Sequence, residues 1–202
     1  MLDERHLSPR ARRHETIRAE IVAAAWDQCR RNGLTSLSLR ELAAAVGMRA
    51  PSLYSYFESK DAIYDAMFRD GQEALAAAMD GVGEERPTTR ASLRAGMRVW
   101  AEFCVSDPVR YQLLFQRVVP GFTPSAASYE LAVRSLGQLT TILSEIGVDD
   151  PAHVDLFTAL VSGLISQQLA NDPGGDRWLR TLDDAIDMYL DHVGALPERN
   201  QP

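Results

Sequence analysis

Residues 38–60 read SLRELAAAVGMRAPSLYSYFESK, and this stretch decides the fold of the N-terminal part of the chain. Ser38 followed by Glu41 is a capping box, a pair of side chains that satisfies two free amides where a helix begins. Gly47 accepts a positive φ without steric cost, so the first short helix ends there, and Pro51 fits the first turn of a second helix. Two short helices joined by a tight glycine turn predict a helix-turn-helix, whose second helix can enter the major groove of DNA.

The same stretch resembles a known family. The run LYSYFESK at residues 53–60, after Leu42-Ala43 and Val46-Gly47, resembles the DNA-binding domain of tetracycline-repressor (TetR) type transcriptional regulators. The resemblance covers roughly residues 15–65 and is specific there. It implies a homodimer that binds a double-stranded DNA operator, with a C-terminal helical domain for a small-molecule effector.

The second helix and its neighbours supply the residues expected to contact DNA. Arg49 stands where the family usually has a Ser or Thr N-cap; since arginine pairs with guanine O6 and N7, it either reads a base or contacts phosphate or solvent. Tyr54 and Lys60 match family positions that hold backbone phosphates, and the amides beside Ser38 and Arg40 also suit a phosphate. The full expected set is Ser38, Arg40, Arg49, Ala50, Pro51, Ser52, Tyr54, Ser55 and Lys60.

Two nearby features leave alternatives open. Residues 1–14 are polar and predict a flexible basic arm, which either contacts the DNA backbone or minor groove or is a solvated tail. The basic residues of this arm are Arg5, Arg10, Arg12 and Arg13. Tyr56 either supports the DNA contacts or packs on its own domain.

The charge of the chain is split between its two ends. The 202 residues carry a net charge of −7, yet residues 1–60 hold 10 basic against 7 acidic side chains. Residues 61–202 hold 11 basic against 21 acidic side chains. Because phosphates repel the acidic part, the basic helix-turn-helix end is expected to face DNA.

Composition is that of an ordinary globular protein, with 46% hydrophobic and 24% charged residues. No apolar run approaches the length of a membrane span, and the N-terminus lacks the apolar core of a signal peptide. Cys29 and Cys104 match no metal-ligand spacing and are expected to be buried thiols in a reducing cytoplasm.

Helical periodicity extends along almost the whole chain. Beyond the helix-turn-helix it predicts helices at about 15–32, 60–79, 88–106, 108–118, 125–146, 150–171 and 175–193. The expected fold is therefore all-α, with an N-terminal three-helix domain and a C-terminal bundle, about nine helices together. The expected organisation is a flexible basic arm at 1–14, a DNA-binding domain at 15–60, and a ligand-binding and dimerisation domain at 61–198.

The C-terminal bundle is expected to hold an effector pocket, although most of its aromatic side chains are expected to be core. Such a pocket has apolar walls and a few polar groups. The segment from Trp100 to Phe115 is similar to one group of the family's C-terminal domains and shows no buried charge, which favours a neutral or hydrophobic effector. The expected lining is Trp100, Phe103, Cys104, Tyr111, Gln112, Phe115 and Tyr129, with Ser162 and Gln167 reaching in.

Apolar stripes on the last two long helices are the candidate dimer interface. Each stripe either faces a partner or packs only inside its own subunit. The resemblance implies a four-helix interface, and one helix-turn-helix covers only a short half-site, so two-fold pairing also fits DNA reading. The expected interface residues are Leu160, Leu164, Trp178, Ile186 and Tyr189.

Motifs of catalysis are absent from the sequence. It holds no glycine-rich phosphate loop, no Gly-x-Ser-x-Gly and no His-Glu-x-x-His. The nearest approach to a metal-binding spacing is Asp150 with His153, which occurs once and at an expected helix start. No enzymatic activity, cofactor or metal is therefore expected.

These features together predict a DNA-binding transcriptional regulator, a repressor released by a small molecule. A ligand in the bundle would favour a state whose two recognition helices are wrongly spaced for successive major grooves. One alternative is an orphan regulator with the same DNA domain and no physiological ligand. A different class, an all-helical enzyme or lipid-binding bundle that keeps the helix-turn-helix for packing, is opposed by the missing motifs and the basic N-terminal end.

Overall fold

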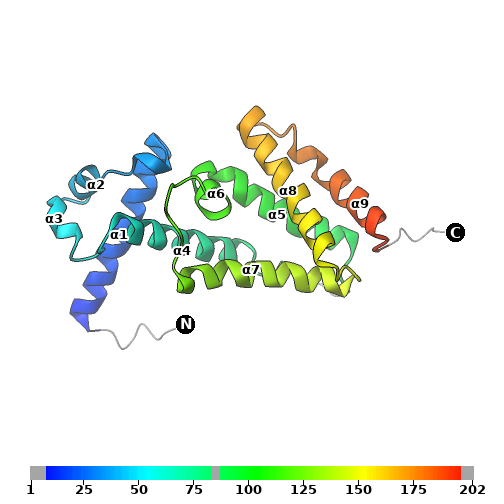
Figure 1. Ribbon diagram of the computed structural model, residues 1–202, viewed down its shortest axis with the longest axis horizontal. Helices are drawn as coiled ribbons and strands as arrows, with labels where there is room; N and C mark the ends of the chain where they lie inside the picture. The colour runs from blue at the N-terminus through cyan, green and yellow to red at the C-terminus, as the bar shows by residue number, and fades with distance from the viewer. Residues whose placement is uncertain (1–7, 83–86, 197–202) are drawn as a thin grey trace. The chain divides into compact units, whose positions relative to one another are not determined.

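The computed structural model describes residues 8–82 and 87–196, and its regular elements there are all helical (Figure 1). This confirms the expected all-α fold. In chain order the elements are α1 (Pro9–Asn32), η2 (Leu34–Ser36), α2 (Leu39–Ala45), α3 (Ala50–Leu53), α4 (Lys60–Ala78), α5 (Arg90–Ser106), α6 (Pro108–Phe115), α7 (Ala126–Glu145), α8 (Pro151–Asn171), η3 (Leu179–Thr181) and α9 (Leu182–Val193).

The first helix begins earlier than expected, at Pro9 rather than near Glu15. The Ser8 hydroxyl accepts a hydrogen bond from the Ala11 amide at 3.2 Å, and Pro9 occupies the first helical position, where its missing N–H costs nothing. The expected flexible arm of residues 1–14 is thus helical from Pro9 onward, and its first seven residues lie outside the described part of the chain.

The chain forms two compact units that do not follow the expected boundary at residue 60. The first unit comprises Met1–Gly71 and Gln112–Tyr129, and the second comprises Gln72–Tyr111 and Glu130–Pro202. Tyr64 on α4 explains the difference, because its hydroxyl donates to the Leu34 carbonyl and its ring centre lies 5.5 Å from that of Phe122. The start of α4 therefore belongs to the core of the first unit, which contains the helix-turn-helix, and does not only link the two units along the chain.

The first unit is built around apolar side chains that the helical period brings together. Among its most completely buried members are Ile21, Leu42, Leu53, Ile63 and Met67, each at most 1% exposed. Trp26 is also buried, and its Nε1 donates to the Asp70 carboxylate at 2.8 Å. A buried indole N–H thus finds its partner on α4.

The second unit rests on α5, which packs against both α8 and α9, while α8 packs against α9. Its core includes Phe157 and Ile165 of α8 with Ile186 and Leu190 of α9, all fully buried. The expected helix at 175–193 is instead the short η3 followed by α9. The Gln168 side-chain oxygen accepts from the Trp178 amide at 2.9 Å, which holds the chain where η3 begins.

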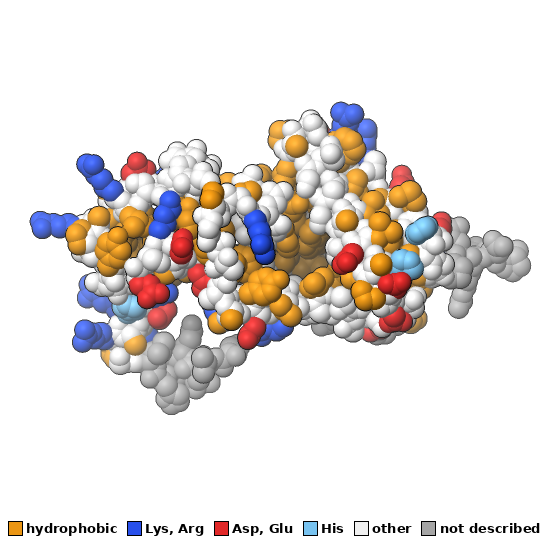
Figure 2. Space-filling model, in the orientation of Figure 1, with side chains coloured by type: hydrophobic (Ala, Val, Ile, Leu, Met, Phe, Trp, Pro, Cys, Tyr) orange, Lys and Arg blue, Asp and Glu red, His pale blue; other side chains and the backbone are white. Residues whose placement is uncertain are grey.

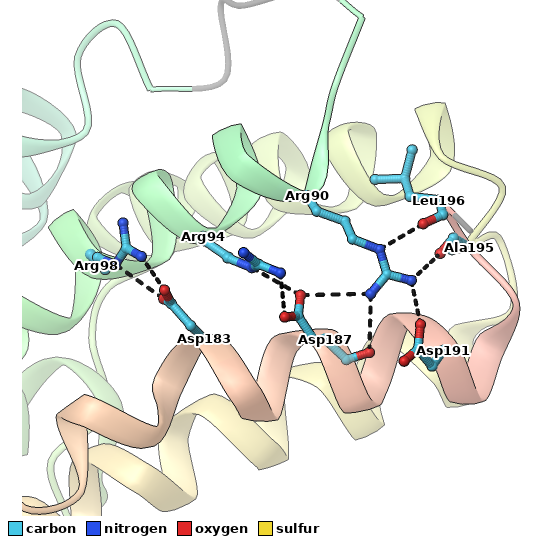
Figure 3. A network of polar contacts seen from close by, with 8 residues as sticks. All are labelled: Arg90, Arg94, Arg98, Asp183, Asp187, Asp191, Ala195 and Leu196. Carbon is cyan, nitrogen blue, oxygen red and sulfur yellow. Dashed lines mark hydrogen bonds and ion pairs between the residues drawn. The ribbon is translucent and has the colours of Figure 1, made fainter. Parts of the chain in front are cut away.

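A ladder of ion pairs joins α5 to α9 (Figure 3). Its members recur every four residues on each helix, so that they share one face of each. Arg98 pairs with Asp183, Arg94 with Asp187, and Arg90 with both Asp187 and Asp191. The pairs fix the register of α9 along α5.

Candidate nucleic-acid interface

The first helix of the helix-turn-helix is started by three side chains rather than two. The Ser38 hydroxyl accepts from the Glu41 amide at 3.4 Å, as a capping box requires. Glu41 does not return to the Ser38 amide; its carboxylate accepts from Gln28 Nε2 at 2.7 Å, and Gln28 Oε1 accepts from the Ser38 amide at 3.3 Å. Gln28 is buried on α1, and its side-chain amide lies between Glu41 and Ser38. These two hydrogen bonds attach α1 to the start of α2.

The turn after α2 is a Schellman motif centred on Gly47. The Gly47 amide donates to the Ala44 carbonyl at 3.1 Å and the Met48 amide to the Ala43 carbonyl at 2.8 Å. Gly47 has φ +69°, a backbone conformation that L side chains rarely adopt. The glycine stop expected from the sequence is present, and it reverses the chain toward α3.

The recognition helix α3 is only Ala50–Leu53, and a hydrogen-bonded turn carries the chain on to Phe57. Arg49 stands at its N-cap without a side-chain capping bond, as expected when arginine replaces a Ser or Thr there. Leu53 and Phe57 are buried at 1% and 3% exposure. Their burial fixes which side of this segment remains for a partner.

The side chains expected at DNA lie on that remaining side. Tyr54 is 58% exposed although it is aromatic. Arg40, Arg49, Pro51, Ser52 and Ser55 are also exposed, whereas Ser38, Ala50 and Lys60 are half-buried. Figure 2 shows Lys and Arg side chains around α2, α3 and the N-terminal end of α1. Most side chains of the expected set are therefore accessible on the first unit, and their contact with DNA remains a prediction.

Two side chains of α1 that were not in the expected set hold the end of the recognition segment. The Arg18 guanidinium lies 4.1 Å from the centre of the Phe57 ring and donates to the Tyr56 carbonyl. The His14 ring stacks on Tyr56 with centroids 4.8 Å apart, and its Nε2 lies 3.4 Å from the Ser55 carbonyl oxygen. Of the two possibilities for Tyr56, packing on its own domain is the one observed. The spacing of His14 and Arg18, four residues apart on one helix, is the signal in the sequence that could have indicated this role.

Lys60 begins α4, and its ammonium lies 5.6 Å from the centre of the Tyr64 ring. Ser59 caps the same helix by accepting from the Ala62 amide at 3.0 Å, as its position predicts. Burial raises the pKa of Tyr64 to about 12, so its hydroxyl stays protonated and keeps donating to Leu34.

The expected pocket residues divide between surface and interior. Phe115 and Tyr129 are 40% and 57% exposed, and Gln167 is exposed and accepts from Asn171 at 2.7 Å. The exposure of these three side chains does not favour a place in the lining of an enclosed pocket. Phe103, Cys104 and Tyr111 are buried in the second unit, and the Tyr111 hydroxyl lies 3.1 Å from the Ser166 hydroxyl. Trp100, Gln112 and Ser162 are half-buried.

The expected dimer residues divide in the same way. Ile186 and Tyr189 are 0% and 2% exposed within a single chain. The Tyr189 hydroxyl donates to the His153 carbonyl at 3.0 Å, and its ring meets that of Phe157. Both are core residues, so their assignment to an interface is wrong. Leu160, Leu164 and Trp178 are half-buried and remain predictions.

Residues 21–67 match the sequence profile of the bacterial regulatory proteins of the tetR family. These residues form a DNA-binding domain of the tetR type. A match to regulatory proteins agrees with the expectation, drawn from the missing catalytic motifs, of a regulator rather than an enzyme. In the described residues, no three His, Cys, Asp or Glu side chains gather as metal ligands, and no helix is long and apolar enough to cross a bilayer.

Similar proteins agree with this placement. The HTH-type transcriptional regulator Rv1816 of Mycobacterium tuberculosis is 30% identical over 129 residues, which are 61% of this chain and 54% of that protein. The match thus spans about half the length of this relative. The crystal structure of the regulatory protein SCO4313 is 24% identical with a TM-score of 0.74, covering 91% of this chain and 100% of that one. The multidrug binding protein EbrR, solved with imidazole, is 20% identical with a TM-score of 0.65, covering 96% of this chain and 100% of that one.

Proposed function

We propose that this protein is a sequence-specific DNA-binding repressor that acts in the cytoplasm as a homodimer. The observation that carries the proposal is the recognition segment, which Leu53 and Phe57 hold from its apolar side. Arg49, Ser52 and Ser55 are left exposed on the other side. Polar side chains on a rigid helix are what base edges and phosphates require.

The proposed partner surface lies on α8 and α9. Leu156 of α8 is 45% exposed and Met188 of α9 is 61% exposed, and the half-buried Leu160 follows Leu156 by one helical turn. Gly163 continues the same stripe, and a Cβ placed there would meet no neighbouring group within 4 Å. Large apolar side chains on two packed helices are typical of an interface, and a two-fold dimer would place two recognition helices for an inverted repeat.

A ligand for the second unit is supported by polar atoms buried without a protein partner. The side-chain oxygen of Gln72, a residue 2% exposed, accepts no hydrogen bond from any described residue, and the buried Trp178 Nε1 donates none. Leaving such a group unsatisfied costs about 1–3 kcal/mol, which a bound molecule with its own donor or acceptor would recover. The expected ligand is a neutral molecule with an apolar body, and repression would end when it binds.

The test of DNA binding is a selection from random duplexes followed by affinity measurements over a range of salt concentrations. We expect enrichment of an inverted repeat with half-sites about one helical turn apart, and an affinity that falls steeply with salt as counterions are released. A selection that enriches no inverted repeat contradicts the proposal.

The test of ligand response is a thermal-shift screen of neutral small molecules, with imidazole as the first probe and each hit repeated against the selected duplex. A ligand of the folded state raises the melting temperature, and a releasing ligand also weakens DNA binding. Gln72→Leu should abolish the shift yet leave the unliganded protein equally or more stable, because an unsatisfied polar group is gone. Gln138→Leu, at an exposed position of the second unit, is the matched control and should leave the shift unchanged. Hits that leave DNA affinity unchanged would refute the coupling.

A further inference from the structure

The first turns of α1 carry three exposed arginines that lie outside the helix-turn-helix. Because Ser8 caps the helix and Pro9 begins it, Arg10, Arg12 and Arg13 stand on a regular helix. Their side chains are exposed, so their charges are available to a partner. A helix gives each of them a defined direction, which a flexible arm does not.

Contacts with the recognition segment fix this helix in place. His14 stacks on Tyr56 at 4.8 Å and places Nε2 3.4 Å from the Ser55 carbonyl oxygen, while Arg18 covers the Phe57 ring at 4.1 Å. All of these residues belong to the first unit. The helix that carries the arginines is thus attached to the same segment that presents Tyr54 and Ser55.

Helical spacing then decides which arginine lies beside the recognition segment. Arg10, His14 and Arg18 follow one another at intervals of four residues and share one face of α1. Arg12 is two residues from Arg10, which turns it to the opposite side of the helix. The face that contacts Ser55 and Tyr56 through His14 therefore continues to Arg10, one turn further toward the start of the helix.

We propose that Arg10 binds a DNA phosphate next to the major-groove site, and that His14 is the residue that positions it. The proposal rests on the proposed function, since it extends the same DNA-binding surface. The partner that fits is the sugar-phosphate backbone, because a guanidinium binds phosphate oxygens in pairs and reads no sequence there. The α1 extension would then contribute affinity and register while Arg49 contributes base preference.

The experiment compares Arg10→Ala with Arg12→Ala in the full chain, using the selected duplex. Both substitutions remove one positive charge, so a general charge effect is the same in both. We expect Arg10→Ala to weaken binding about five-fold at low salt and to flatten the plot of log affinity against log salt by about 0.9, the contribution of one phosphate contact. Arg12→Ala should leave the slope near that of the unsubstituted protein.

His14 provides the second comparison. His14→Ala removes the stack on Tyr56 and should flatten the salt dependence of the affinity as much as Arg10→Ala does. His14→Phe keeps the stack, so its salt dependence should stay close to that of the unsubstituted protein. The double variant of Arg10→Ala and His14→Ala should bind DNA little more weakly than either single variant. Equal effects of Arg10→Ala and Arg12→Ala would overturn the inference while the proposed function stands. Failure of the unsubstituted protein to enrich any duplex would overturn the proposed function, and this inference with it.

Discussion

Arg49 and Lys60 carry charge at the two ends of the recognition segment, and we predict different roles for them from their surroundings. Arg49 is exposed at the N-cap of α3 with no capping bond, so its guanidinium can extend toward a base edge. Lys60 is half-buried at the start of α4 beside the Tyr64 ring. A point charge so placed suits a phosphate.

Substitution separates the two tasks. Arg49→Ala should relax the preference at one position of each half-site, at a cost of about 1–3 kcal/mol if the contact is bidentate. Lys60→Ala should weaken all duplexes alike and reduce the salt slope by about one. The measurement is affinity for the selected duplex and for single-base variants of it. Equal weakening of every duplex by Arg49→Ala would assign Arg49 to phosphate.

Buried thiols give the stability of the folded chain a dependence on alkaline pH. Burial raises the pKa of Cys29 from its ordinary 9.0 to about 11, and it also raises the pKa of Cys104. The unfolded chain loses these protons first, so it binds fewer protons than the folded chain, and the free energy of unfolding falls as pH rises. We expect Cys29 to account for a fall on the order of 2 kcal/mol between about pH 9 and pH 11.

Urea unfolding over this pH range measures that fall, and Cys29→Ala is the control that removes one titrating group. Tyr64, whose pKa burial raises to about 12, adds to the fall only above about pH 10. A stability profile of Cys29→Ala parallel to that of the parent below about pH 10 would contradict the prediction.

Helices in this protein are fixed at their ends by residues from other helices. The Asp65 carboxylate on α4 accepts from the Ser125 amide at 2.7 Å, the Ser125 hydroxyl at 3.0 Å and the Ser128 hydroxyl at 2.9 Å, where α7 begins. Asp65 and both serines lie within the first unit. This is why residues 112–129 belong with the DNA-binding unit although they are distant in sequence.

The ion pairs between α5 and α9 differ in burial, and we expect their contributions to the free energy of unfolding to differ accordingly. Arg90 is only 11% exposed at its side chain and donates to the Leu196 carbonyl at 2.6 Å as well as pairing with Asp187 and Asp191. Arg98 is 54% exposed and pairs with Asp183. Exposed pairs are screened by water, whereas enclosed donors leave unsatisfied acceptors behind when removed.

Arg90→Met should therefore lower the free energy of unfolding by about 2 kcal/mol, and Arg98→Met by less than about 1 kcal/mol. Methionine keeps the apolar stem of arginine in both, which makes the pair of variants matched. Urea or thermal unfolding of the full chain gives both values. If Arg98→Met lowers the free energy of unfolding as much as Arg90→Met, burial does not determine what these ion pairs contribute to stability.

At the scale of the whole molecule, exposure separates the proposed partner surface from the core on the same helix. Ile186 and Met188 both lie on α9, but Ile186 is 0% exposed and Met188 is 61% exposed. A buried unpaired carboxylate is expensive, while an exposed one costs little unless a partner covers it. The two positions are two residues apart, so they face different sides of α9.

Ile186→Asp should unfold the second unit, whereas Met188→Asp should give folded monomers that bind the operator weakly. Light scattering reports the oligomeric state and circular dichroism the helical content. Asp184→Ala is the control, since Asp184 is exposed on the same helix. A Met188→Asp variant that remains dimeric would place the interface elsewhere.

Local interactions explain why the helix-turn-helix, the glycine stop at Gly47 and the all-α fold could be predicted from the amino-acid sequence. Capping residues, glycine and helical periodicity act within a few residues, so their pattern along the chain is sufficient. Folding in three dimensions was needed to show that Gln28 completes the cap at Ser38, that Asp65 holds the start of α7, and that Ile186 and Tyr189 are core. These features depend on side chains from distant segments meeting in space, and an apolar stripe has the same period whether it covers a core or a partner.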